Sequence, residues 1–70
     1  MALTPVMDSS IKALGYDEKT GVLYVEFTSM STYAYSNVPK EVFEDLMRSG
    51  NKNKYLHDNV KKRYTFSKVG

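Results

Sequence analysis

Apolar and polar residues alternate most clearly over Val22–Thr28. Successive strand side chains point to opposite faces, so Leu23, Val25 and Phe27 would share one face of an extended chain. The opposite face mixes polar and apolar residues: Val22, Tyr24 and Glu26. This pattern predicts a strand whose uniformly apolar face packs in the core.

Two weaker segments predict neighbouring strands at Ser10–Tyr16 and Thr32–Ser36. The first is apolar on both faces, so alternation leaves its inward face open. Gly15 could mark a bulge that switches the facing partway along this strand. Asp17–Gly21 predicts the turn to the next strand, because Asp hydrogen-bonds to the backbone two residues on and Gly adopts positive φ.

Tyr33 and Tyr35 share a face of the third strand, and the length of the loop before them decides which face that is. A two-residue loop ending at Met30 would set Tyr33 opposite Glu26, on the outer face. A three-residue loop would set Tyr33 opposite Phe27, in the core. The loop residues do not favour a two-residue turn strongly enough to decide between them.

The apolar period changes to that of a helix near Pro39, whose missing N–H costs nothing at the first helical position. Gly50 is a natural stop. We expect helices at about Pro39–Ser49 and Lys52–Arg63. The predicted fold class is therefore α+β, a three-stranded antiparallel β-meander followed by two C-terminal α-helices (β-β-β-α-α).

The chain has 70 residues, no cysteine, six tyrosines and three phenylalanines. A chain this short has a small core, so large aromatic side chains should contribute much of it. We expect one domain over residues 1–70, with loose termini at residues 1–7 and 65–70. The absence of cysteine, of a leader-like segment and of a membrane-length apolar run favours a cytoplasmic protein.

The net charge is only +2, but the charges are unevenly distributed. Residues 1–50 hold four basic and seven acidic side chains, a net charge of −3, and residues 51–70 hold six basic and one acidic, a net charge of +5. Such asymmetry is typical of a surface that faces a polyanion, although runs of charge often serve only to solvate a helix.

Several short motifs occur in an order that is more specific than any one of them. They are Ser9-Ser10-x-x-x-x-Gly15-Tyr16-Asp17, Leu23-x-Val25-x-Phe27, Tyr33-x-Tyr35, Val38-Pro39 and Tyr55-Leu56…Val60…Arg63-Tyr64. Together they resemble the KTSC family, a short domain named from the C-terminal region of some lysyl-tRNA synthetases, over about residues 8–64.

This resemblance implies a small stand-alone protein of bacterial or phage type. The function of the family is not established, and its association with the synthetases implies RNA binding. The family commonly has Gly where this chain has Met30, and Ser and Gly where it has Asn51 and Asn53. A Gly at the hairpin tip would favour the two-residue loop and place the tyrosines on the outer face.

These features favour a small non-catalytic nucleic-acid-binding or accessory module, with single-stranded RNA or another nucleic acid as the ligand. The candidate residues are Tyr24, Tyr33 and Tyr35 for stacking on bases, and Lys52, Lys54, Lys61, Lys62 and Arg63 for contacts with phosphates. The competing interpretation places the tyrosines in the core, under a helix.

A second class of function is a protein–protein interaction or homodimerisation module, because a short sheet has two edges on which another strand can pair. Catalysis is not expected: the nucleophile candidates Ser9 and Ser10 have one histidine available, His57, in a distant helix. We expect no metal site, no cofactor and no membrane partner.

Overall fold

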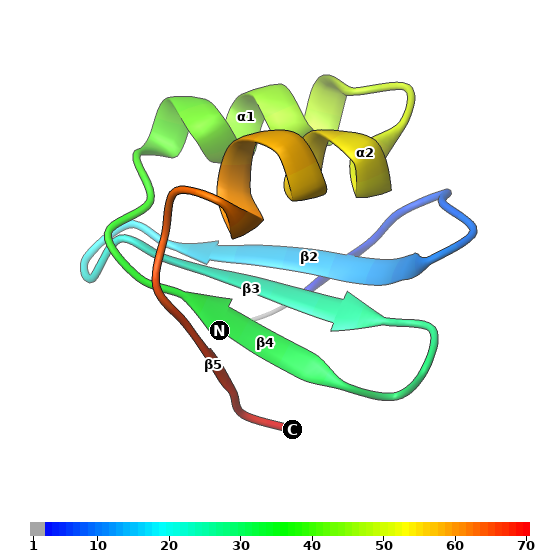
Figure 1. Ribbon diagram of the computed structural model, residues 1–70, viewed down its shortest axis with the longest axis horizontal. Coiled ribbons are helices and arrows are strands. Elements are labelled where there is room, and N and C mark those ends of the chain that lie inside the picture. Colours follow the sequence, from blue (N-terminus) through cyan, green and yellow to red (C-terminus); the bar gives the residue numbers. More distant parts are fainter. Residues whose placement is uncertain (1–2) are drawn as a thin grey trace.

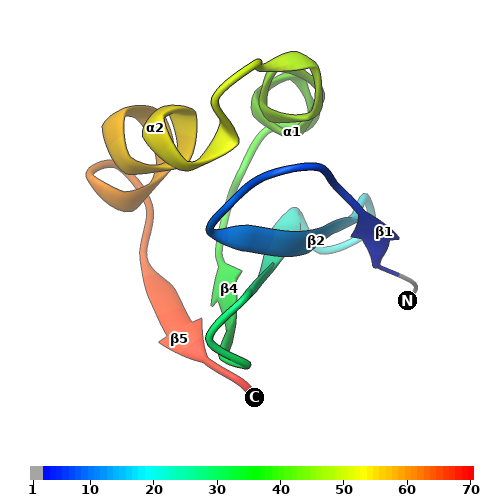
Figure 2. The same cartoon turned by 90° about the vertical axis from the view of Figure 1, so that its right-hand side faces the viewer.

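The computed structural model describes residues 3–70 and shows a five-stranded antiparallel sheet with two helices packed on one face (Figures 1 and 2). The strands are β1 (Thr4–Pro5), β2 (Ile11–Asp17), β3 (Val22–Phe27), β4 (Thr32–Tyr35) and β5 (Phe66–Lys68). The helices are α1 (Lys40–Arg48) and α2 (Lys52–Leu56), and α2 continues as the π-helical segment η1 (His57–Lys61). The strands lie in chain order, β1 to β5. The α+β class is confirmed, and the sheet has five strands where the sequence predicted three.

The two additional strands form the edges of the sheet, in segments that the sequence pattern presented as termini. β1 pairs with β2, with Pro5 opposite Ala13. Proline is compatible with an edge strand because its missing N–H can face away from the ladder. β5 pairs with β4, with Phe66 opposite Tyr35. Beyond β5, the Val69 N–H donates to the Thr32 carbonyl at 2.8 Å, so the pairing continues. Residues 1–2 of the predicted N-terminal segment lie outside the described range.

The β3–β4 hairpin places both tyrosines of β4 on the helix-covered face. Val25 lies opposite Tyr33, and the Phe27 N–H donates to the Ser31 carbonyl at 2.8 Å. The loop therefore has three residues, which end at Met30 in the left-handed conformation with a φ of 73°. The facing is that of the three-residue alternative, but Tyr33 pairs with Val25 rather than Phe27. The Gly that the family commonly has at the position of Met30 therefore fits a three-residue loop, and it does not require the two-residue loop.

A bulge in β2 sets its inward face. The register shifts between Ile11 and Ala13, which leaves Lys12 as the extra residue. Because of this shift, Ile11 and Leu14 can both be fully buried. The switch of facing that the sequence suggested is present, but at Lys12 rather than at Gly15.

Both helices bury one apolar stripe against the sheet. Leu46 of α1, Leu56 of α2 and Val60 of η1 are fully buried together with Leu23 of β3. The first predicted helix is confirmed, with Pro39 as its N-cap residue rather than its first residue. No helix within residues 3–70 is long and apolar enough to cross a membrane.

Asp8 connects the start of β2 to the start of the second helix. One carboxylate oxygen accepts from the Ser10 N–H at 2.9 Å, and the other accepts from the Lys52 N–H at 3.2 Å. Asn51 caps the same helix, since its side chain accepts from the Lys54 N–H at 3.1 Å. Desolvation raises the pKa of Asp8, but the hydrogen bonds from backbone amides outweigh it and hold this pKa below 3.8.

Candidate functional site

The three tyrosines predicted to stack on bases lie in different environments. Tyr35 lies in the core and is 1% exposed. Burial is the main cause that raises the pKa of its hydroxyl, and the neighbouring Tyr33 raises this pKa further. Tyr24 pairs with Ala34 and faces the side of the sheet away from the helices. Tyr33 is half-buried beside the core. The structure therefore does not bring the three together as one stacking surface, and Tyr35 is too buried to contact a base.

Tyr33 instead belongs to a row of aromatic rings that includes two phenylalanines. Its ring meets Phe27 edge-on with centroids 5.6 Å apart, and it stacks on Phe66 at 5.6 Å and 16°. Phe66 also leans on Tyr35 at 5.7 Å. We call Phe27, Tyr33 and Phe66 the aromatic row. It exists because β5 aligns Phe66 with β4 and because the hairpin register aligns Tyr33 with β3.

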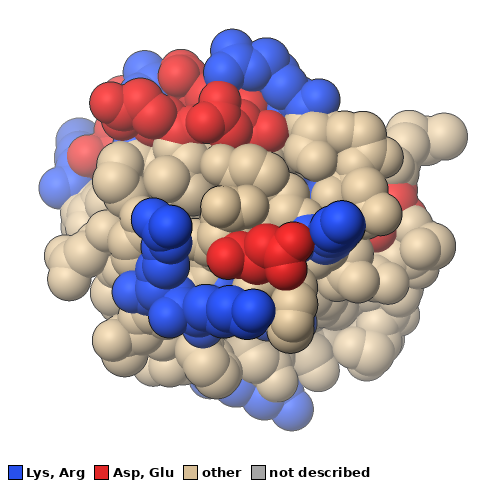
Figure 3. Space-filling view, turned by 45° about the horizontal axis from the view of Figure 1, so that its top comes forward, with Lys and Arg blue, Asp and Glu red and all other residues tan. Residues whose placement is uncertain are grey.

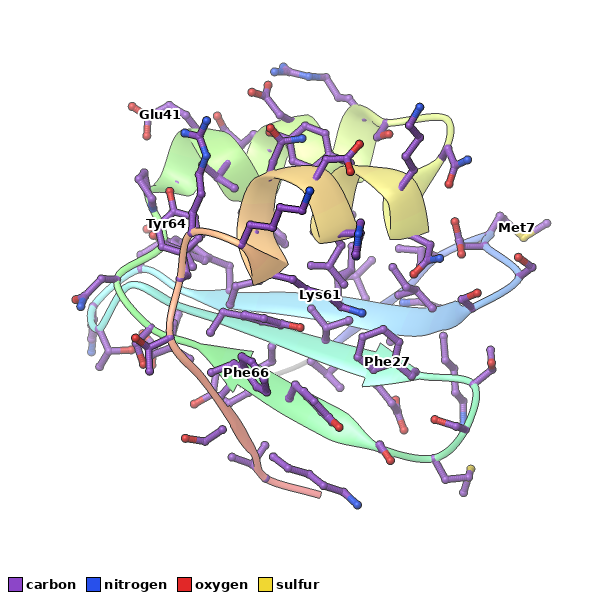
Figure 4. The ribbon with its side chains drawn as sticks, in the orientation of Figure 1. Met7, Phe27, Glu41, Lys61, Tyr64 and Phe66 are labelled. Atoms are coloured by element: carbon purple, nitrogen blue, oxygen red, sulfur yellow. The ribbon has the colours of Figure 1, made fainter. Side chains whose placement is uncertain are left out.

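A cavity of about 220 Å³ opens at the Phe27 end of the aromatic row. Its lining comes from the hairpin and from η1: Phe27, Ser29, Ser31, Tyr33 and Lys61. The Lys61 ammonium lies 5.3 Å from the centre of the Phe27 ring, a cation–π distance, and Figure 4 shows this side chain extending from η1 toward Phe27. The cavity thus combines aromatic rings, two serine hydroxyl groups and one cation.

A second lysine flanks the other end of the row. Lys68 of β5 pairs with Tyr33 of β4. Phe66 and Lys68 are two residues apart on β5, so their side chains lie on the same face of the sheet. Both Lys68 and Phe66 are exposed, and the exposed fraction of Phe66 is 50%. One face of the Phe66 ring is therefore covered by Tyr33, and half of the residue remains open to solvent.

The other predicted basic residues are distributed more widely. The Lys52 ammonium donates to the Ser49 carbonyl at 2.9 Å. Lys54 lines a separate cavity of about 220 Å³, formed by the loop after α1 and by α2 and η1, with Ser49, Asn51, Tyr55, Asp58 and Asn59. Lys62 and Arg63 follow η1 and are exposed. Of the predicted cations, Lys61 alone lines the cavity beside Tyr33.

Charge is segregated between the two helices. The acidic side chains of α1 are exposed, as are the basic ones at the end of the second helix. Figure 3 shows acidic side chains gathered over α1 and basic ones in front of them. Some of the acidic charge is paired, since the Arg48 guanidinium lies 2.6 Å from the Asp45 carboxylate. An anionic ligand is favoured on the η1 side and disfavoured over α1.

Sequence reasoning found Tyr33 and Lys61 but missed their neighbours. Phe27 was read only as a core residue, because it ends the apolar face of its strand. Phe66 and Lys68 were missed because a three-residue strand has too few positions to show alternation. A signal for Phe66 did exist: it is the one aromatic residue in the C-terminal segment 65–70.

The model of the KTSC domain matches residues 7–64. The chain belongs to the KTSC domain family. The crystal structure of a KTSC domain protein from Yersinia pestis superposes with a TM-score of 0.94 over 99% of this chain and 97% of that one, at 28% sequence identity.

Other KTSC relatives differ greatly in length. A protein from Tsukamurella paurometabola is 39% identical over 62 residues, which make up 89% of this chain and 92% of the relative. The lysine–tRNA ligase of Nostoc punctiforme is 36% identical over 61 residues, but these make up only 11% of the ligase. The KTSC domain therefore corresponds to a small part of that ligase.

Proposed function

We propose that this KTSC domain is a small non-catalytic module that binds single-stranded nucleic acid, with RNA as the preferred ligand. The observation that supports this most is the combination of the aromatic row with Lys61 at the cavity rim. Single-strand binders stack bases on aromatic side chains and neutralise phosphates with nearby lysines and arginines. The lysine–tRNA ligase relatives agree with this proposal, since their substrate is an RNA.

The electrostatic setting of the row also favours an anionic ligand. Glu26 pairs with Thr32 and points to the opposite face of the sheet from Phe27 and Tyr33. Its carboxylate is thus on the far side of the sheet from the rings, whereas Lys61 and Lys68 are on the near side. A base that stacks on the row would bring its phosphate toward a cation rather than toward a carboxylate.

The proposal is tested by titrating a labelled single-stranded RNA, with single-stranded DNA and duplex as competitors, at two salt concentrations. We expect micromolar or tighter binding that weakens as salt rises. Phe66→Leu should weaken it about tenfold, because it keeps an apolar side chain but removes the stacking surface. Lys61→Ala should weaken it at low salt and reduce its salt dependence.

Two matched controls separate binding from folding. Tyr24→Leu removes an aromatic ring from the opposite sheet face, and Lys54→Ala removes a cation that lines the other cavity. Both should leave the affinity within about twofold of the original. No binding by the folded protein at low salt would contradict the proposal, as would equal losses in the site variants and in these controls.

A second candidate function is a protein-interaction or homodimerisation module. It is favoured by the exposed apolar side chains of Met30, Phe66 and Val69, whose exposed fractions are 75%, 50% and 56%. These residues lie at the hairpin tip and along the edge strand, where another strand can pair. An apolar interface should tolerate salt, so self-association measured by analytical ultracentrifugation at high salt distinguishes this candidate.

We also propose that the protein acts in the bacterial or phage-infected cytoplasm, without a cofactor or a metal. The cysteine-free composition suits a reducing compartment. Detection of the protein in a fractionated cell would test the compartment.

A further inference from the structure

We infer that the site of this KTSC domain holds two consecutive nucleotides: one base in the cavity lined by Phe27, Tyr33 and Lys61, and the next base on the exposed face of Phe66. This inference rests on the proposed function and specifies the substrate as a short unpaired segment or strand end, rather than a long single strand. Single-strand binding modules that track a strand occupy about 4–16 nucleotides per fold.

The length of the aromatic row limits the number of stacked bases. Its ring centres are 5.6 Å apart from Phe27 to Tyr33 and 5.6 Å apart from Tyr33 to Phe66. The row ends at Phe66, since β5 is the last strand of the sheet, and it ends at Phe27 beside the hairpin loop. Tyr33 is covered on one face by Phe66. Two ring surfaces thus remain for bases, one inside the cavity and one on the outer side of Phe66.

The cations match this count. Lys61 lies at the cavity, and Lys68 lies beside Phe66 on the same sheet face. Among the other predicted cations, the Lys52 ammonium donates to the Ser49 carbonyl, and Lys54 lines the separate cavity at α2 and η1. A strand that continued over α1 would meet exposed carboxylates. Lys62 and Arg63 are exposed after η1, but neither lines the cavity. Lys61 and Lys68 are therefore the two cations that we expect to neutralise phosphates at the site.

The cavity also provides hydrogen-bonding groups for the edge of its base. Ser29 and Ser31 line it, and a hydroxyl both donates and accepts. Because each hydroxyl rotates to suit its partner, these serines can satisfy the polar edge of any base. We expect the cavity to require an unpaired base and to discriminate weakly among the four.

The experiment is a length series of 5′-phosphorylated RNA: the mononucleotide, the dinucleotide, the trinucleotide and a long oligonucleotide, titrated into the full chain. We expect an increase in affinity of about tenfold from mononucleotide to dinucleotide, from the second stacked base. Strands longer than the dinucleotide should bind less than about threefold more tightly than the dinucleotide. This comparison divides each affinity by the number of positions at which the site can bind along the strand.

The salt dependence gives an independent count of the phosphates. Each neutralised phosphate of a single strand contributes a slope of about −0.7 in log affinity against log salt, so two give about −1.4, whereas the five cations predicted from sequence would give about −3.5. Lys68→Ala should reduce the slope by about 0.7, and Lys54→Ala should leave it unchanged.

The outcomes distinguish the two proposals. An affinity that keeps rising with length, or a slope near −3.5, would overturn the two-nucleotide site while the proposed function stands. An absence of binding at every length and low salt would overturn both. A plateau at two nucleotides that is lost in Phe66→Leu and kept in Tyr24→Leu supports the inference.

Discussion

Tyr33 and Tyr35 are neighbours on one strand face, yet their surroundings give them different roles. Tyr35 is enclosed by the core and by Phe66, whereas Tyr33 lies at the margin, where its ring also lines a cavity. The same residue type at the same spacing thus contributes stability at one position and a ligand-facing surface at the next.

Replacing Tyr35 should therefore cost stability rather than binding alone. We expect Tyr35→Ala to lower the free energy of unfolding by about 3–5 kcal/mol, because it leaves a large cavity in a small core. Urea denaturation monitored by circular dichroism measures this loss. Tyr35→Phe retains the ring and should stay within about 1.5 kcal/mol of the original, which keeps the test informative if Tyr35→Ala does not fold. A stable, fully folded Tyr35→Ala would contradict the burial of this ring.

Asp8 gives a prediction about pH. Its pKa is lowered in the folded protein, so its charge adds stability that is fully present above the unfolded pKa of about 3.9 and is lost as pH falls through the lower folded pKa. At pH 7, Asp8→Asn should lower the free energy of unfolding by about 1 kcal/mol, because the carboxylate accepts from amides at the start of the helix.

The difference between the original protein and Asp8→Asn should shrink as pH is lowered below about 4. Denaturation curves at several pH values measure it. Asp58→Asn, which changes an exposed carboxylate on η1, serves as the control and should have little effect. A difference that stays constant down to the lowest pH would show that the Asp8 charge does not contribute.

At the scale of elements, the hairpin carries local strain at Met30. Its φ of 73° is left-handed, a conformation that costs a side-chain-bearing residue about 1–2 kcal/mol, and its side chain is 75% exposed. Met30→Gly should therefore raise the free energy of unfolding by about 0.5–1 kcal/mol, after the added entropy of the unfolded chain.

Chemical denaturation of Met30→Gly and of a control, Ser29→Gly, measures this effect. Ser29 occupies the same loop with an ordinary φ, so Gly there should lower stability by about 0.5–1 kcal/mol. A loss of stability in both variants would contradict the three-residue turn.

The elements differ in how well the sequence predicts them. β3 and α1 are long enough for alternation and helical period to identify them, and the turn chemistry of Asp17 locates the first hairpin. β1 and β5 have two and three residues, and their pairing depends on tertiary contacts. The π-helical segment has only five residues, about one turn, so it is too short to show a period of its own in the sequence.

The candidate site was only partly predictable for the same reason. Tyr33 was identified by its spacing from Tyr35, and Lys61 by its place in a basic segment. Their proximity depends on the hairpin register and on the packing of η1, and the contribution of Phe66 depends on β5. A one-residue change of register would have moved Tyr33 to the other face.

At the scale of the whole molecule, the fold separates a structural side from a candidate binding side. The acidic helix α1 covers the first strands (Figures 2 and 3). The aromatic row, its cavity and two lysines gather where η1, the hairpin and β5 meet, and Figure 4 shows Phe27, Lys61 and Phe66 on this side. A small core therefore both stabilises the fold and positions rings at its margin.

The first measurement should be an NMR titration of the ¹⁵N-labelled protein with single-stranded RNA at low salt. Binding at the aromatic row predicts chemical-shift changes for the amides of residues 27–33, 61 and 66–68. The amides of α1 should change little, and the largest changes should not centre on Tyr24. Changes centred on the Tyr24 face or on α1, or no changes at saturating RNA, would contradict the proposed binding site.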